Sequence, residues 1–188
     1  MGNGTLENKI IEHCAPTLAG MKSAGLFSYF FADALDAKKQ LQQINGLLNE
    51  KGVYVEALLW RKDSVLVYTY RPQILGQELE KEGAWELLKA CGYKSTQVES
   101  CLEHLKTRLD GYTCFPHEIG LFLGYPLEDV KGFIENGGRN CKCCGLWKVY
   151  CNEKETTKLF ARLNKCTDVY RHVFAAGRGI VQMTVCAC

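Results

Sequence analysis

The sequence has no hydrophobic run long enough to cross a membrane. Its longest apolar stretch, AGLFSYFFADAL at residues 24–35, is interrupted by Asp33, whereas a transmembrane helix needs about 20 consecutive apolar residues. The stretch MGNGTLENKI at residues 1–10 also lacks the apolar segment of a secretory signal. We therefore expect a cytoplasmic protein that has no membrane partner.

A surplus of one sign of charge is also missing. The chain has 23 Lys and Arg residues against 21 Asp and Glu residues, which gives a formal net charge of +2. Proteins that bind nucleic acids usually gather a clear basic excess on one face or in one run, and no polybasic run occurs here. We therefore expect no nucleic-acid partner. The glycine-rich loops of common nucleotide-binding folds are absent as well.

The composition that remains is that of a folded globular protein, with 47% hydrophobic and 23% charged residues. At 188 residues the chain has the length of a single domain, in which the residues from about 140 onward are a candidate C-terminal sub-region. Runs rich in β-branched and aromatic residues at 53–60 and 64–70 flank the short RKD segment and predict a central β-hairpin.

Further elements follow from the spacing of apolar residues. Strands are predicted over residues 24–31, 146–151 and 180–186. Helices are predicted over residues 5–20, 33–52, 72–92 (two short helices), 95–109, 115–138 (two helices bent at 124–126) and 152–177. This order predicts an α+β fold, a single domain whose mixed sheet of about five strands is covered by helices.

Cysteine is abundant, and its distribution predicts where chemistry takes place. The chain has 11 cysteines, and the segment NCKCCGLWKVYC at residues 140–151 holds four of them. Thiolates bind zinc in tetrahedral sites, and iron–sulfur clusters also use thiolates. We predict a site for zinc or iron that combines two separate groups of thiols. The predicted ligands are Cys141, Cys143, Cys144, Cys186 and Cys188.

Two other interpretations of these cysteines stay open. Arg139, Lys142 and Lys148 lie close to the thiols in sequence, and nearby cations favour the reactive thiolate, which would suit redox chemistry. In a reducing compartment, cysteines also serve as small apolar residues that fill the core.

His117 and Glu118 are the candidate residues for an enzyme. They follow Pro116 at the predicted start of a helix, and a histidine beside a carboxylate can act as an acid or a base. The sequence HEIGL does not complete the HExxH motif of zinc proteases. The alternative is structural, since a carboxylate at a helix N-terminus caps free N–H groups.

Arg178 lies between two glycines in the segment GRG at residues 177–179. Glycine-rich backbone can form a concave nest of N–H groups that binds an anion, and an arginine would assist it. The alternative is a helix end followed by a tight turn.

Several segments resemble a known family. The string HEIGLFLGYPLEDVKGF at residues 117–133, followed by GLWKVYC at 145–151, resembles the signature of the bacterial domain-of-unknown-function family 3793. The strings CAPTLAGMKSAGLFS at 14–28 and VLVYTYRP at 65–72 fit the same family. The resemblance covers about residues 14–175 and implies a cytoplasmic setting in anaerobic Gram-positive bacteria. It supplies no activity, cofactor or catalytic residue, and it implies a redox partner protein such as a flavodoxin.

We therefore predict an accessory protein of the cytoplasm that uses its clustered cysteines to bind a metal ion or for thiol redox chemistry. An enzyme with a site near His117 and Glu118 is one alternative. An interaction module without a chemical site is the other.

Overall fold

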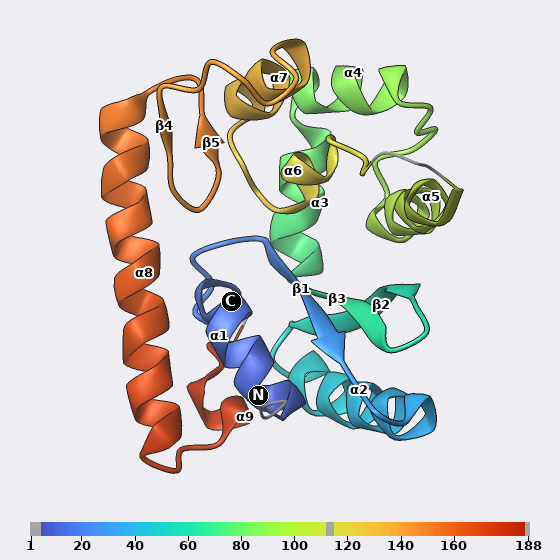
Figure 1. Ribbon diagram of the computed structural model, residues 1–188, viewed down its shortest axis with the longest axis vertical. Coiled ribbons are helices and arrows are strands. Elements are labelled where there is room, and N and C mark those ends of the chain that lie inside the picture. Colours follow the sequence, from blue (N-terminus) through green and yellow to red (C-terminus); the bar gives the residue numbers. More distant parts are fainter. Residues whose placement is uncertain (1–4, 112–114, 187–188) are drawn as a thin grey trace. The chain divides into compact units, whose positions relative to one another are not determined.

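The structure is a computed structural model that describes residues 5–111 and 115–186. The chain forms two compact units (Figure 1). Residues 1–74 and 166–188 form the first, called the terminal unit, and residues 75–165 form the second, called the central unit. The chain passes between them within two continuous helices, α3 (Pro72–Glu80) and α8 (Glu153–Ala175). The single domain expected from the chain length stays a prediction.

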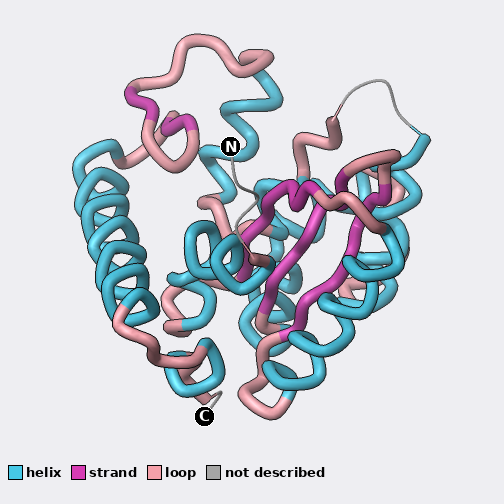
Figure 2. The backbone as a smooth tube through the Cα atoms, turned by 60° about the horizontal axis from the view of Figure 1, so that its bottom comes forward, coloured by secondary structure: helices cyan, strands magenta, loops and turns pink. Residues whose placement is uncertain are grey.

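A three-stranded antiparallel sheet forms the centre of the terminal unit. Its strands are β1 (Ala24–Phe30), β2 (Tyr54–Trp60) and β3 (Ser64–Tyr70), and their order in the sheet is β1-β3-β2 (Figure 2). The predicted hairpin is therefore confirmed, and β3 is the strand paired on both sides. Tyr29 and Val67 belong to the core that this sheet shares with helices α1 (Leu6–Leu18) and α2 (Ala34–Asn49).

Local sequence signals account for where these helices begin. The Thr5 side chain accepts a hydrogen bond from the backbone N–H of Asn8 at 3.3 Å, and the Asp33 side chain accepts one from Leu35 at 2.8 Å. Such caps satisfy N–H groups that have no partner within the helix.

The strand predicted over residues 180–186 is wrong, because the chain forms the short helix α9 (Ile180–Met183) there. Ile180 and Met183 are both buried, and their spacing of three residues suits one face of a helix. Arg71, only 3% exposed, holds the next residues in place. Its guanidinium donates hydrogen bonds to the carbonyls of Thr17, Leu18 and Val185, at 2.6, 2.7 and 2.7 Å. The tail therefore pairs with the end of α1 instead of joining the sheet.

The central unit is mainly helical. Besides parts of α3 and α8, it contains α4 (Glu82–Ala90), α5 (Val98–Gly111), α6 (Ile119–Phe122) and α7 (Leu127–Glu135). Its strands β4 (Cys143–Cys144) and β5 (Lys148–Val149) form a small antiparallel hairpin. The α+β class and the number of about five strands are thus confirmed. The described strands are divided between two antiparallel sheets instead of forming one mixed sheet.

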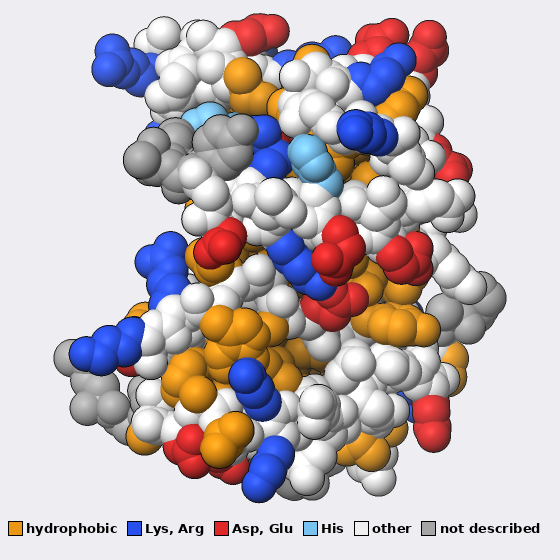
Figure 3. All heavy atoms as spheres, turned by 90° about the vertical axis from the view of Figure 1, so that its right-hand side faces the viewer, with side chains coloured by type: hydrophobic (Ala, Val, Ile, Leu, Met, Phe, Trp, Pro, Cys, Tyr) orange, Lys and Arg blue, Asp and Glu red, His pale blue; other side chains and the backbone are white. Residues whose placement is uncertain are grey.

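Acidic and basic side chains are interspersed on the face that Figure 3 shows, in keeping with the small net charge. Within residues 5–111 and 115–186, none of the helices is both long enough and apolar enough to cross a membrane.

Candidate functional site

A buried carboxylate fixes the β4–β5 hairpin against α7. Asp129 lies in the first turn of α7 and is only 2% exposed. Its Oδ2 accepts a hydrogen bond from the Trp147 indole N–H at 2.8 Å, and its Oδ1 accepts bonds from the backbone N–H groups of Tyr150 at 2.8 Å and Cys151 at 3.0 Å. A buried charge is tolerated only when hydrogen bonds replace its lost hydration. These three bonds therefore set the position and the orientation of the Trp147 ring.

A pocket of about 280 Å³ lies next to this ring, within the central unit. Most of its wall is aromatic or aliphatic. The lining residues are Phe115, His117, Ile119, Gly120, Tyr125, Asp129, Val130, Phe133, Leu146, Trp147 and Lys148.

The aromatic rings of the pocket support one another. Trp147 stacks on Tyr125 with the ring centroids 4.6 Å apart, and Phe160 meets Trp147 edge-on at 4.5 Å. The His117 ring meets Phe133 edge-on at 5.0 Å. Packing of this kind holds rings in fixed orientations, so the aromatic walls are formed before any ligand arrives.

Gly120 permits the close approach of α6 and α7 that forms the floor of the pocket. A Cβ atom at this position would lie 2.7 Å from a methyl carbon of Val130 and 3.3 Å from the Tyr125 ring. Even alanine would therefore push these elements apart, which explains the glycine in the HEIGL segment.

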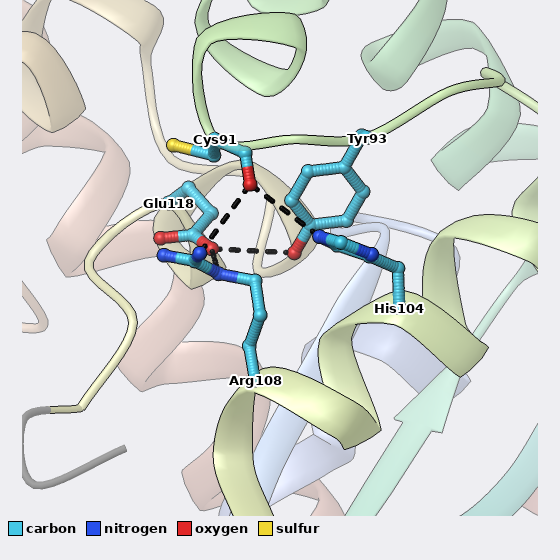
Figure 4. A network of polar contacts seen from close by, with 5 residues as sticks. All are labelled: Cys91, Tyr93, His104, Arg108 and Glu118. Carbon is cyan, nitrogen blue, oxygen red and sulfur yellow. Dashed lines mark hydrogen bonds and ion pairs between the residues drawn. The ribbon is translucent and has the colours of Figure 1, made fainter. Parts of the chain in front are cut away.

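A network of buried polar groups lies beside the pocket wall and is called the Glu118 network (Figure 4). Glu118, 2% exposed, forms an ion pair with the Nε of Arg108 and accepts a hydrogen bond from the Tyr93 hydroxyl at 3.3 Å. Arg108 also donates to the carbonyl of Cys91 at 3.3 Å, and the His104 Nε2 lies 3.4 Å from the same oxygen. The network thus joins α5, the end of α4 and the start of α6.

In the Glu118 network, the charged groups are the ion-paired side chains of Glu118 and Arg108. Burial lowers the pKa of Arg108, but the hydrogen bond and the negative charge of Glu118 raise it by more, so that its pKa is raised overall. Burial, and then the charge of Glu118, raise the pKa of Tyr93 and of Cys91. The phenol and the thiol therefore remain protonated, and the network is suited to holding α6 in place.

A second group of buried polar side chains lies in the terminal unit, where α1 ends and β1 begins. Thr17, Ser23 and Thr69 are at most 2% exposed. Within the described part of the chain, the Thr17 and Ser23 hydroxyls make no hydrogen bond, and a hydrogen bond from Thr69 acts on the Cys14 thiol. Burial lowers the pKa of Lys22 to about 8 and raises the pKa of Cys14 to about 12, and each of these groups acts on the other electrostatically.

Comparison with known proteins identifies the family. A family model described as "Protein of unknown function (DUF3793)" matches residues 10–184. The chain belongs to this family. The match covers nearly the whole sequence and confirms the resemblance of the HEIG and LWKVY segments. Searches of curated proteins and of solved structures found no significant match.

In this member of the DUF3793 family, His117 and Glu118 are neighbours in the chain but have different surroundings. His117 is exposed and lines the pocket, whereas Glu118 is buried and bonded to Arg108. The Glu118 side chain makes no capping hydrogen bond at the start of α6, so its partner is a distant arginine. Their joint action as acid and base stays a prediction.

The predicted metal ligands lie in both units. Cys141 is half-buried, Cys143 is half-buried and packs against the hydrophobic cluster of Trp147, and Cys144 is exposed. Cys186, in the terminal unit, is exposed, and its sulfur accepts a hydrogen bond from the Lys51 amine at 3.4 Å. Cys188 lies outside the described residues.

Within residues 5–111 and 115–186, no group of three or more His, Cys, Asp or Glu side chains is arranged to hold a metal ion. The nine cysteines of this part of the chain are free thiols. The shared metal site of Cys141, Cys143, Cys144, Cys186 and Cys188 stays a prediction.

Arg178 is exposed in the turn between α8 and α9. Gly177 has a φ of +90°, a conformation that glycine adopts readily, and its N–H donates to the carbonyl of Phe174 at 2.9 Å. These contacts fit the helix-end interpretation, and anion binding by Arg178 stays a prediction.

Proposed function

We propose that this protein binds a small, flat and largely apolar molecule in the pocket of the central unit. The observation that carries the proposal is the aromatic wall, in which Tyr125, Phe133 and Trp147 surround a space of about 280 Å³. Small-molecule sites are mostly apolar cavities of roughly 300–1,000 Å³, so this volume suits a ligand of one or two fused rings.

Preorganisation is the second argument for binding. The Trp147 indole is held by Asp129 on its N–H and by Tyr125 on its face. A binding surface that is already ordered loses little conformational entropy when a ligand enters.

The geometry also supports ligand binding better than it supports catalysis by His117 and Glu118. The Glu118 carboxylate is engaged by Arg108 and Tyr93, whereas a general base must lie within reach of a substrate proton. Free thiols throughout the described part of the chain support a reducing, cytoplasmic setting for this function.

The proposal can be tested with N-phenyl-1-naphthylamine, a neutral dye that fluoresces in apolar surroundings. We expect saturable binding, which Phe133→Ala weakens about tenfold because the variant loses ring contacts and buried area. Ile134→Ala is the matched control, since Ile134 lies next to Phe133 on α7 but does not line the pocket. Circular dichroism checks that each variant is folded. Non-saturable binding, or equal weakening by both variants, would contradict the proposal.

Metal or thiol chemistry is a second candidate function. It is supported by Cys141, Cys143 and Cys144, three thiols within four residues, of which Cys144 is exposed. Elemental analysis of protein purified without oxygen tests it. Zinc or iron near one ion per chain, lost in Cys141→Ser and Cys144→Ser, is the expected result, and only trace metal would remove this candidate.

A further inference from the structure

The charges around the pocket are uneven, and this unevenness points to the kind of ligand. Besides the Tyr125 phenol, whose pKa is raised by burial, three lining residues carry ionisable groups, namely His117, Asp129 and Lys148. Both oxygens of Asp129 already accept hydrogen bonds from the Trp147 indole and from backbone N–H groups. A carboxylate that is saturated with N–H donors offers little to a cationic ligand, so the negative charge of Asp129 belongs to the scaffold.

The Lys148 amine, in contrast to the Asp129 carboxylate, has hydrogen-bonding capacity left for a ligand. Lys148 is exposed, its amine lies 5.8 Å from the centroid of the Phe133 ring, and it donates a hydrogen bond to the carbonyl of Gly138 at 2.7 Å. In the described part of the chain, no carboxylate pairs with it. An ammonium group has three N–H donors, so two remain for a ligand at the rim of the aromatic wall.

The position of Lys148 is fixed at both ends. Its backbone lies in β5 and pairs with Cys144 of β4, and its amine donates a hydrogen bond to Gly138 in the turn after α7. A lysine held in this way presents its charge at a constant place beside the pocket. His117, whose ring also contacts Phe133, adds a further polar group to the pocket lining.

We infer that the ligand is an aromatic carboxylic acid, whose ring lies against the aromatic wall and whose carboxylate is bound by Lys148. This inference rests on the proposed function, because it names the chemical class of ligand for the same pocket. Lys148 would then determine specificity, while the aromatic wall contributes affinity that does not depend on ligand charge.

The experiment compares three ligands that share one ring system and differ in charge. They are 1-naphthoate, 1-naphthamide and 1-naphthylmethylamine, which are anionic, neutral and cationic at neutral pH. Each displaces N-phenyl-1-naphthylamine in a fluorescence titration. We expect the acid to bind at least about tenfold more tightly than the amide, and the amine to bind most weakly.

Lys148→Met tests the assigned residue. The variant should lose the preference for the acid, so that the acid and the amide bind with affinities within about twofold of each other. Lys142→Met is the matched control, because Lys142 is an exposed lysine just before β4 that does not line the pocket. Added salt gives a readout that needs no variant, since it should reduce the preference for the acid in the wild-type protein.

The outcomes separate this inference from the proposed function. Equal binding of the three ligands by the wild-type protein, or a preference that survives in Lys148→Met, overturns the inference and leaves the pocket as a general apolar site. Failure of the dye and of every naphthalene ligand to bind overturns both.

Discussion

At the scale of single residues, local signals in the sequence were sufficient for the helix starts but not for the buried charges. The capping role of Thr5 involves a residue three positions away, and such a pattern can be found by inspection. The partners of Asp129 lie 18 to 22 residues away, and the Arg108 partner of Glu118 lies 10 residues away in the sequence. Proximity of that kind is created by folding, so these partners could not be found from the sequence, which suggested an acid–base role or a capping role for Glu118.

Lys22 gives a prediction for stability as a function of pH. Burial lowers its pKa from 10.5 to about 8. Between these two values the unfolded chain holds a proton that the folded chain has released, so the free energy of unfolding should rise as pH rises. Below about pH 8 both states are protonated, and the cost of burying the charge is present in full.

The measurement compares wild type with Lys22→Met by denaturant unfolding at a series of pH values. We expect the stability of the wild type relative to the variant to increase by about 1–3 kcal/mol from neutral pH to about pH 10. The pKa of Cys14 is raised from its usual value of 9.0, so this thiol lowers the free energy of unfolding as the pH rises above about 9. The thiol is present in both proteins, however, and does not account for a difference between them. A difference that does not change with pH would show that the Lys22 amine is solvated in the folded protein.

At the scale of elements, long periodic segments were predicted well and short ones were not. Helices α2 and α5 and the β2–β3 hairpin lie where their apolar patterns placed them. The β4–β5 strands have two residues each, and α9 has four. Their conformation depends on Asp129 and Arg71, which come from distant parts of the chain and bind the residues that follow β5 and α9, namely Tyr150 and Val185. The pocket was missed for the same reason, since its rings come from separate segments: Tyr125 from the loop between α6 and α7, Phe133 from α7, and Trp147 from the turn between β4 and β5.

The Glu118–Arg108 pair should act as one unit that holds α6 on α5. The two side chains are 3% and 20% exposed. Removing one partner of a buried pair leaves the other charge without compensation and typically costs about 3–5 kcal/mol. Glu118→Gln and Arg108→Met should therefore each destabilise the protein by roughly 3 kcal/mol. The double variant should lose less than the sum, with a coupling of about 1–3 kcal/mol.

Denaturant unfolding of the four proteins in this cycle supplies the measurement. The control is Glu155→Gln, because Glu155 and Lys158 form an ion pair in which both side chains are more than 70% exposed. Pairs of this kind contribute at most about 1 kcal/mol. Additive effects of the two network variants would mean that the ion pair does not join α5 to α6.

At the scale of the whole molecule, the arrangement of the chain connects the two units covalently at two places. The central unit is an insertion between the two segments of the terminal unit, and α3 and α8 are continuous across both boundaries. Unfolding one unit would fray a helix that the other unit shares. This shared helical structure favours a single cooperative transition, which is the behaviour of the single domain expected from the chain length.

Two buried thiols can report on each unit without any mutation. Cys14 in the terminal unit and Cys101 in the central unit are at most 1% exposed. Brief alkylation at increasing denaturant, followed by mass analysis of the peptides, gives the concentration at which each thiol becomes reactive. Single-domain behaviour predicts coincident midpoints, because neither thiol is exposed until the whole chain unfolds. Exposed Cys144 should react at every concentration and controls for the reagent. If Cys101 reacts at clearly lower denaturant than Cys14, the central unit unfolds independently and the chain has two domains.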